Sequence, residues 1–418
     1  MNLFNKIKKR GLFLTINYCL ITIIYKVIKF FYIRCLNRSK VEDNIFIFSS
    51  RPDFSDNAKY MYSYIMNNNL NTNNKYIWLV NFDCKLKESN ENTKIIKINS
   101  KFHKGQSLKA LYYISKAKIL FFTHTSPMTE INKKDNQTII NLWHGCGYKS
   151  VEKGKKSWVD NNPFDYALVP GTVFIKTKSE FWGCNEEQIL PIGYPRYDLL
   201  CKDNIDVEKF KENLCANNKL IIWMPTFRKT INGNYPEEKV NMDYDLPLLS
   251  SDKEVEQLND ICKHKNIILC IKRHPMQVEY TCEKMNLSNI IFIDNEYLVR
   301  NNIELYSLLK YSDSLITDYS SIAIDYLLLD KPIGFTLDDF DKYKETRGFV
   351  FENPLDYMPG HYIYNFNDLT EYIKDISEGQ DLYKEEREKV INEVHNKCDN
   401  YCERIYDFLR KIEGDKNE

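Results

Sequence analysis

The chain has 418 residues, of which 43% are hydrophobic and 28% charged, so it can fill two domain cores and is not a disordered chain. Its formal net charge is +0, but residues 1–41 hold nine Lys or Arg and no acid, which leaves 49 basic against 58 acidic residues elsewhere. The excess of acidic residues in the chain beyond residue 41 excludes general nucleic-acid binding. Twelve cysteines form no CxxC pair, and Cys398 and Cys402 have only His395 nearby, so the pattern predicts free thiols and no metal site.

Residues 1–41 have the pattern of a membrane-associating helix. A basic start precedes a charge-free stretch, residues 11–25, whose 15 residues fall short of the ~20 that a spanning helix needs. Cations interrupt the apolar residues beyond it, and no signal-peptide cleavage site follows. We expect a helix in the headgroup region of an anionic inner leaflet, and hence a peripheral protein on the cytoplasmic face of the cell membrane. A helix docked on the core and a true span are the alternatives.

From residue 44 onward, short apolar runs alternate with helical patterns. Strands are expected at residues 45–48, 76–80, 95–98, 119–122, 138–142, 166–169 and 189–192, then at 220–223, 267–271, 290–293, 314–316 and 333–335. Helices are expected near residues 57–66, 106–116, 173–181, 254–264, 303–309 and 322–328, with one closing helix over 380–412. This alternation predicts an α/β protein with two Rossmann-like domains and parallel sheets. We place the domains at residues 42–205 and 206–412, divided in the turn-rich stretch 194–208.

Polar and glycine-rich residues follow most of these strands, at the edge where open α/β sheets bind ligands. In the first half they occupy residues 143–147 and 193–198, and in the second half residues 224–228, 272–275 and 317–321. Two such sheets facing each other would form a cleft lined with cations and backbone N–H groups. That lining suits a nucleoside diphosphate compound.

Several of these residues have the chemistry that phosphate transfer needs. Arg228, Lys272 and Arg273 could neutralise a diphosphate, and the corner 318–321 could donate hydrogen bonds to it or be an ordinary helix cap. His144 is the better general base, because histidine titrates near neutral pH. His274 is expected to hold a phosphate or shape its loop, and His124 to line the cleft. Arg347 and Gly348 could close over the cleft or belong to a packed hairpin.

Together these segments resemble the CDP-glycerol glycerophosphotransferase family of teichoic acid synthesis. The resembling segments, in family order, are Trp143-His144-Gly145, Gly193-Tyr194-Pro195-Arg196 with Asp198, Pro225-Thr226-Phe227-Arg228, Arg273-His274-Pro275, Thr317-Asp318-Tyr319-Ser320-Ser321 with Asp325, Lys331-Pro332-Ile333, and Arg347-Gly348-Phe349 followed by Pro359-Gly360. The resemblance implies a GT-B architecture with the donor in the cleft. It implies two catalytic residues, His144 and His274, and a set of substrate contacts: Gly145, Arg196, Thr226, Arg228, Arg273, Thr317, Asp318, Ser320, Ser321 and Arg347.

The implied reaction transfers glycerol phosphate from CDP-glycerol to a hydroxyl of a membrane-bound acceptor and releases CMP. The acceptor is expected to be a lipid-linked glycan or polyol phosphate of a teichoic-acid-like or capsular polymer. CDP-ribitol as donor, a GT-B glycosyltransferase using a nucleotide sugar, and a non-catalytic binding scaffold are the alternatives. No cofactor is obligatory, while Mg²⁺ and a homo-oligomer stay open. The residues Cys146-Gly147-Tyr148 depart from the family's usual Thr-Pro-Leu, so the acceptor's identity is open as well.

Overall fold

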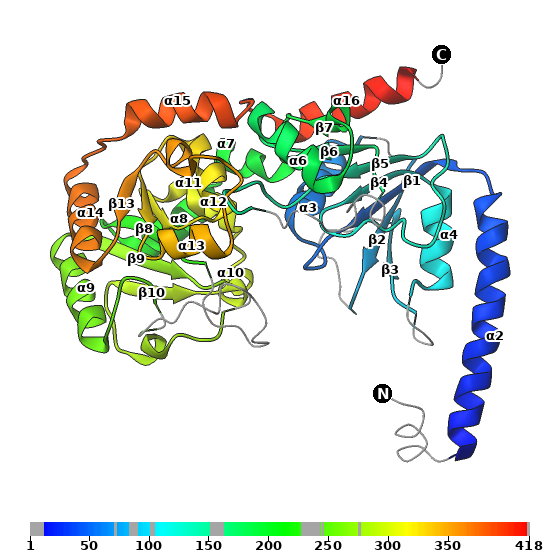
Figure 1. Cartoon of the computed structure of the whole chain (residues 1–418), viewed down its shortest axis with the longest axis horizontal. Helices are drawn as coiled ribbons and strands as arrows, with labels where there is room; N and C mark the ends of the chain where they lie inside the picture. Colours follow the sequence, from blue (N-terminus) through cyan, green and yellow to red (C-terminus); the bar gives the residue numbers. More distant parts are fainter. Residues whose placement is uncertain are drawn as a thin grey trace.

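The protein is built on two parallel β-sheets, seen at the two ends of the molecule in Figure 1. The computed structural model describes residues 12–70, 73–82, 91–100, 105–150, 163–226, 244, 246–274 and 277–415. We refer to the first sheet with its helices as the first domain, and to the second sheet with its helices as the second domain. The boundaries at residues 42–205 and 206–412 stay a prediction.

Within the described residues, the first sheet has seven parallel strands in the order β3-β2-β1-β4-β5-β6-β7. They are β1 (Glu42–Ser49), β2 (Lys75–Val80), β3 (Thr93–Lys97), β4 (Ala117–Phe122), β5 (Thr138–Asn141), β6 (Tyr166–Leu168) and β7 (Ile189–Leu190). Helices α3 (Asp56–Asn67), α4 (Leu108–Lys116), α6 (Ile175–Trp182) and α7 (Asp198–Cys201) belong to this domain. The central strands β1 and β4 carry continuous apolar runs because both of their faces are buried.

The second sheet, over the same described ranges, has six parallel strands in the order β10-β9-β8-β11-β12-β13. They are β8 (Lys219–Met224), β9 (Ile267–Lys272), β10 (Ile290–Ile293), β11 (Ser314–Thr317), β12 (Ile333–Thr336) and β13 (His361–Ile363). Its helices are α8 (Ile205–Cys215), α9 (Asp252–His264), α10 (Asn295–Arg300), α11 (Leu305–Tyr311), α12 (Ser321–Tyr326), α13 (Phe340–Thr346) and α14 (Phe366–Glu378). Every strand expected from the sequence is present, and in the described part of the chain β13 is the one strand that the apolar pattern did not indicate.

Both sheets reverse their strand order beside their first strand. In the first domain β1 lies between β2 and β4, and in the second β8 lies between β9 and β11. In doubly wound sheets the loops at such a reversal form the ligand crevice. The loops that leave β1, β4, β8 and β11 therefore determine where a site can form.

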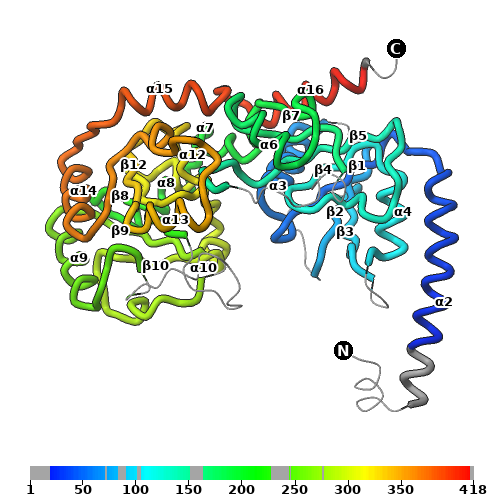
Figure 2. The backbone as a smooth tube through the Cα atoms, in the orientation of Figure 1, coloured from blue at the N-terminus to red at the C-terminus, as the bar shows by residue number. Residues whose placement is uncertain are grey.

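The end of the chain crosses from the second domain back to the first. We expected one closing helix, but the structure has two, α15 (Lys384–Val394) and α16 (Tyr401–Asp415), because the chain turns between them to follow the other domain. Figure 2 shows this red segment running along the top of both domains. At the first domain, the backbone N–H of Tyr401 donates to Asp198 over 2.6 Å.

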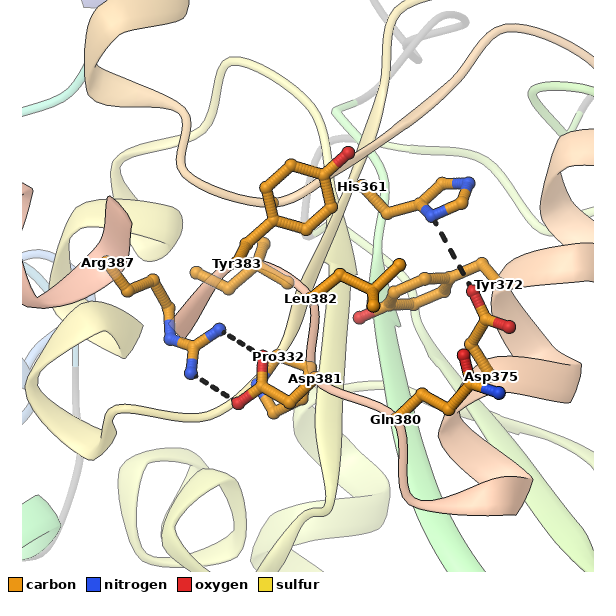
Figure 3. A pocket seen from close by; sticks show the side chains of 11 residues that line it. Pro332, His361, Tyr372, Asp375, Gln380, Asp381, Leu382, Tyr383 and Arg387 are labelled. Carbon is orange, nitrogen blue, oxygen red and sulfur yellow. Dashed lines mark hydrogen bonds and ion pairs between the residues drawn. The ribbon is translucent and has the colours of Figure 1, made fainter. Parts of the chain in front are cut away.

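The buried side chain of Arg387 holds the first of these two helices in place. Its guanidinium pairs with Asp381, with Nη2 2.6 Å from Oδ2 (Figure 3). It also pairs with Asp330. A cavity of about 20 Å³ lies beside it, and no described site residue expected from the sequence lines that cavity. The ion pairs here are structural.

The N-terminal helix α2 (Leu12–Asn37) packs against α4 of the first domain. Lys29 is buried, donates to the carbonyl of Gln106 over 2.8 Å and pairs with Glu130. In contrast, a set of large apolar side chains on α2 is at least half exposed: Leu20, Ile21, Ile23, Ile24, Val27, Ile28, Phe30 and Phe31. Among the described residues, no helix is long and apolar enough to cross a membrane.

Candidate active site

His144 lies in the loop that leaves β5, and its imidazole is oriented by the neighbouring strand. Its Nδ1 is 3.0 Å from the carbonyl oxygen of Thr123, at the end of β4. A carbonyl can only accept, so Nδ1 carries the proton and Nε2 carries the lone pair. The ring of His124 stacks on it, with centroids 4.1 Å apart and planes within 8°. The ring is therefore held in the tautomer that a general base needs.

The electrostatic surroundings keep His144 neutral. Burial, followed by the neighbouring His124, lowers the pKa of His144 to about 4. At neutral pH the imidazole therefore has a free lone pair on Nε2. A bound anionic substrate would raise this pKa, because negative charge favours the imidazolium.

The loop that carries His144 is packed directly against the second domain. Gly145 has φ +137°, and a Cβ at that position would lie 2.8 Å from Oγ of Ser321. A Cβ at Gly147 would lie 2.8 Å from the Cα of the same serine. Both positions therefore need glycine for this close approach. The structure thus brings Gly145 and Ser321, two predicted substrate contacts from different domains, into contact with each other.

Arg196 is buried between carboxylates rather than exposed to a ligand. Its Nη1 donates to Asp56 over 2.8 Å and to the carbonyl of His144 over 3.0 Å. Its Nη2 lies 2.7 Å from Asp325 on α12. Arg196 is only 5% exposed, so this geometry indicates that it positions the His144 loop and joins the domains.

Thr226, Thr317 and Asp318 form a buried hydrogen-bonded group at the ends of β8 and β11. Asp318 accepts from the backbone N–H and the hydroxyl of Thr226. Thr317 donates to the carbonyl of Met224 over 2.8 Å. The helix that follows, α12, has only six residues, with Ser320 at its N-cap. This group ties the two strand ends of the second-domain crevice together.

A cationic cavity of about 190 Å³ opens beside this group. Its lining includes Lys149, Thr226, Lys272, Arg273, His274, Asn295 and Ser320. Burial lowers the pKa of His274 to about 4, and Lys149 and Lys272 add to the effect. Burial also lowers the pKa of Lys272 to about 8, so this lysine is still mostly protonated at neutral pH. The cavity therefore offers two ammonium groups and a neutral imidazole to an anion.

Arg273 lies in the wall of this cavity, but its guanidinium is engaged by protein carboxylates. Nη1 is 3.0 Å from Glu283 and Nη2 is 2.9 Å from Asp294. It therefore lends its charge to the cavity wall while its donors link the residue after β9 to Glu283 and to the residue after β10. Lys149, which the motif analysis missed, does reach the cavity and lies 3.5 Å from the hydroxyl of Thr226. The sequence feature that could have identified Lys149 is its position in the His144 loop.

Two predicted site residues remain, Arg228 and Arg347. Arg228 is outside the described residues. Arg347 is half-buried at the end of α13, and its Nε has no hydrogen-bond partner in the described part of the chain. The next residue, Gly348, accepts a hydrogen bond from the backbone of Ser150, so this segment pairs with the end of the His144 loop. Among the described residues, no group of His, Cys, Asp or Glu is arranged to hold a metal ion.

Two doubly wound parallel-sheet domains, with the His144 loop of the first packed on the Ser320–Ser321 corner of the second, form the architecture of the GT-B class. The family model for CDP-glycerol:poly(glycerophosphate) glycerophosphotransferase matches residues 30–411, and the chain belongs to this family. The family that the sequence motifs indicated is thereby confirmed.

Curated relatives with similar sequences act in teichoic acid synthesis according to their names. The teichoic acid poly(glycerol phosphate) polymerase of Staphylococcus epidermidis is 28% identical over 355 residues, which cover 80% of this chain and 45% of that protein. The teichoic acid ribitol-phosphate polymerase TarK of Staphylococcus aureus is 27% identical, over 78% of this chain and 60% of that protein. The teichoic acid glycerol-phosphate primase of Bacillus subtilis is 26% identical, over 73% of this chain and 76% of that protein. The chain thus spans about half the length of the first two relatives.

Solved structures confirm the fold. The wall teichoic acid polymerase TagF superposes with a TM-score of 0.73 at 22% identity, covering 96% of this chain and 98% of that one. A second TagF structure, with a histidine replaced by alanine, gives a TM-score of 0.72 at 23% identity. The two-domain GT-B architecture expected from the sequence is therefore correct.

Proposed function

We propose that this protein transfers a polyol phosphate, glycerol phosphate in the first place, from a CDP-activated donor to a hydroxyl of a polymer acceptor, with release of CMP. The observation that carries the proposal is the contact between the His144 loop and the Ser320–Ser321 corner, which joins a neutral imidazole to a cationic cavity. The glycerol phosphate and ribitol phosphate in the names of its relatives support the same chemistry.

In the proposed reaction, Nε2 of His144 accepts the proton of the acceptor hydroxyl. The hydroxyl oxygen forms a bond to the phosphorus that bears the glycerol, and the bond from that phosphorus to the oxygen of CMP breaks. The charge that develops on CMP is stabilised by Lys149, Lys272 and neutral His274 in the cationic cavity. Water then takes the proton from His144.

A panel of donors tests this proposal. CDP-glycerol, CDP-ribitol and a nucleotide sugar would be offered with a short glycerol phosphate oligomer as acceptor, and CMP release followed. We expect turnover of a CDP-polyol, with His144→Ala inactive. Turnover of only the nucleotide sugar would favour a GT-B glycosyltransferase, and donor binding without release by the wild type would favour a scaffold.

We also propose that α2 places the enzyme on the cytoplasmic face of an anionic membrane, where CDP-linked donors are found. Its half-exposed apolar residues and the basic residues 6–10 and 26–40 support an interfacial position. Co-sedimentation with vesicles that contain anionic lipid tests this. Replacing Ile24, Ile28 and Phe31 by Ser should leave the protein in the supernatant, and continued sedimentation of that variant would contradict the proposal.

A further inference from the structure

A cavity of about 170 Å³ opens in the first domain, at the carboxyl ends of β1 and β4. Its lining includes Arg51, Asn81, Asn99, Gln106, His124 and Glu130. None of the described residues that the family motifs predict as substrate contacts lines it. It is therefore distinct from the cationic cavity of the second domain, although both lie beside the reversal point of their sheets.

The cavity is connected to the candidate base through His124. His124 forms part of the wall, and its ring stacks on the ring of His144, with centroids 4.1 Å apart. Arg51 and His124 line the same cavity, and the positive charge of Arg51 adds to burial in lowering the pKa of His124. A ligand in the cavity thus lies between Arg51 and the His124–His144 stack.

The lining is polar and carries one unneutralised cation. Glu130 is paired with Lys29 of α2, with Oε2 2.6 Å from Nζ, so its charge is compensated. Arg51 is exposed, and within the described part of the chain it forms no ion pair. Gln106 is 5% exposed, and its Oε1 has no partner among the described residues, while its Nε2 donates to Pro127. Amides, a buried acceptor and one arginine suit a ligand with several hydroxyls and one phosphate.

The same wall is where α2 is fastened to the domain. Lys29 contacts both Gln106 and Glu130, and both of these residues line the cavity. The exposed apolar residues of α2 lie before and after Lys29 along the helix. A ligand whose lipid end lies in the surface contacted by α2 would therefore present its head group at this cavity.

We propose that the cavity beside Arg51 binds the terminal polyol phosphate unit of the acceptor. Arg51 pairs with its phosphodiester, and its end hydroxyl is directed past His124 to His144. This proposal rests on the proposed function. It adds where the acceptor binds, and that the bound unit carries a phosphate. Its test can nevertheless be made without turnover, because binding to this cavity needs no donor.

Calorimetric titration of the full chain with a short glycerol phosphate oligomer, in the absence of donor, measures the site directly. Arg51→Ala should weaken binding at least tenfold, because the charge-assisted contact to phosphate is lost. Arg51→Lys should recover part of the affinity. Thr129→Trp, which fills the exposed rim of the cavity, should weaken binding independently. Arg410→Ala, a change of the same kind at an exposed position of α16, is the control and should bind as the wild type does.

In turnover assays, Arg51→Ala should raise the acceptor KM and leave the donor KM unchanged. The proposal would be overturned if the wild type did not bind the oligomer. It would also be overturned if Arg51→Ala and Thr129→Trp both bound the oligomer as tightly as the wild type does. If the oligomer binds in an Arg51-dependent way while no CDP-polyol is turned over, the cavity assignment stands and the proposed function fails. A far-UV spectrum of each variant shows that it is folded.

Discussion

Arg196 and Asp325 form a buried ion pair between the two domains, with Nη2 of the arginine 2.7 Å from Oδ2 of the aspartate. Arg196 follows the last strand of the first sheet, and Asp325 lies on α12 of the second domain. The hydroxyls of Tyr197 and Tyr306 also donate to this carboxylate. Because Arg196 donates to the carbonyl of His144 as well, the domain contact and the candidate base share one arginine.

Arg196→Ala should strongly destabilise the protein. It would leave Asp325, which is 1% exposed, without its cation, and removing one partner of a buried pair costs roughly 3–5 kcal/mol. Urea unfolding measures this free energy. The control is Lys265→Ala, which breaks the much more exposed Lys265–Glu378 pair and should cost roughly 0–1 kcal/mol. Equal losses in the two variants would show that the Arg196–Asp325 pair does not hold the domains.

His144→Gln should reduce CMP release by roughly 10²–10⁴-fold, the usual contribution of a general base, while donor binding is retained. In the wild type, the acid limb of kcat/KM should lie near pH 4 instead of 6.5, because the pKa of free His144 is lowered to about 4. A pH–rate profile checks this. His264→Gln, at an exposed position of α9, serves as the control. An acid limb near pH 6.5 would assign the base to another group.

Lys272→Met should raise the KM for the donor about tenfold or more and leave the acceptor KM unchanged, because the buried ammonium faces the cationic cavity. The pKa of Lys272 is lowered to about 8, so its charge is present below pH 8 and is lost above it. The donor KM of the wild type should therefore rise as the pH passes 8. The variant should lack this rise, and Lys253→Met on the exposed face of α9 should retain it.

Stability should fall as the pH drops from about 6.5 to about 4. The pKa of His144, His274 and His395 is lowered to about 4, chiefly by burial, whereas the unfolded chain has ordinary histidines near 6.5. Between these values the unfolded state binds more protons, so acidification favours unfolding. Above about pH 7 these histidines no longer make the stability depend on pH.

The pH dependence of the thermal midpoint measures this effect, and one variant isolates one histidine. His395 is buried, with Nε2 2.7 Å from the carbonyl of Ile324. His395→Gln should lower the midpoint at every pH and flatten its dependence between pH 4 and 6.5. His264→Gln should leave the slope unchanged. A slope that is the same in His395→Gln and the wild type would mean that this histidine titrates normally in the folded protein.

The location of the site at the strand ends could be predicted because it depends on local pattern. An apolar run followed by a glycine or a polar residue marks the end of a buried strand, as at Asn141 before His144 and at Thr317 before Asp318. Parallel strands then bring such ends to one edge of the sheet. The strand β13 was missed for the same reason, since only Ile363 of its three residues is fully buried, while His361 and Tyr362 are partly exposed.

The roles of the arginines could not be predicted in this way. Arg196 and Arg273 have the residue type that binds phosphate, but their carboxylate partners are Asp325, Asp294 and Glu283, the first of which is 129 residues away. Conversely, Lys149 and Arg51 belong to no motif we recognised and lie in cavities. Whether a cation binds a ligand or a carboxylate depends on what the fold places beside it.

The sequence by itself determined the two parallel sheets, the family and the loops that carry the chemistry, because strand and motif patterns are local along the chain. Only the tertiary structure decided that the His144 loop packs on Ser321 through two glycines, that Arg196 is buried between Asp56 and Asp325, and that a second cavity lies beside His124. Each of these features is a contact between segments far apart in the chain. Such contacts are set by how the two domains pack together, which no local pattern encodes.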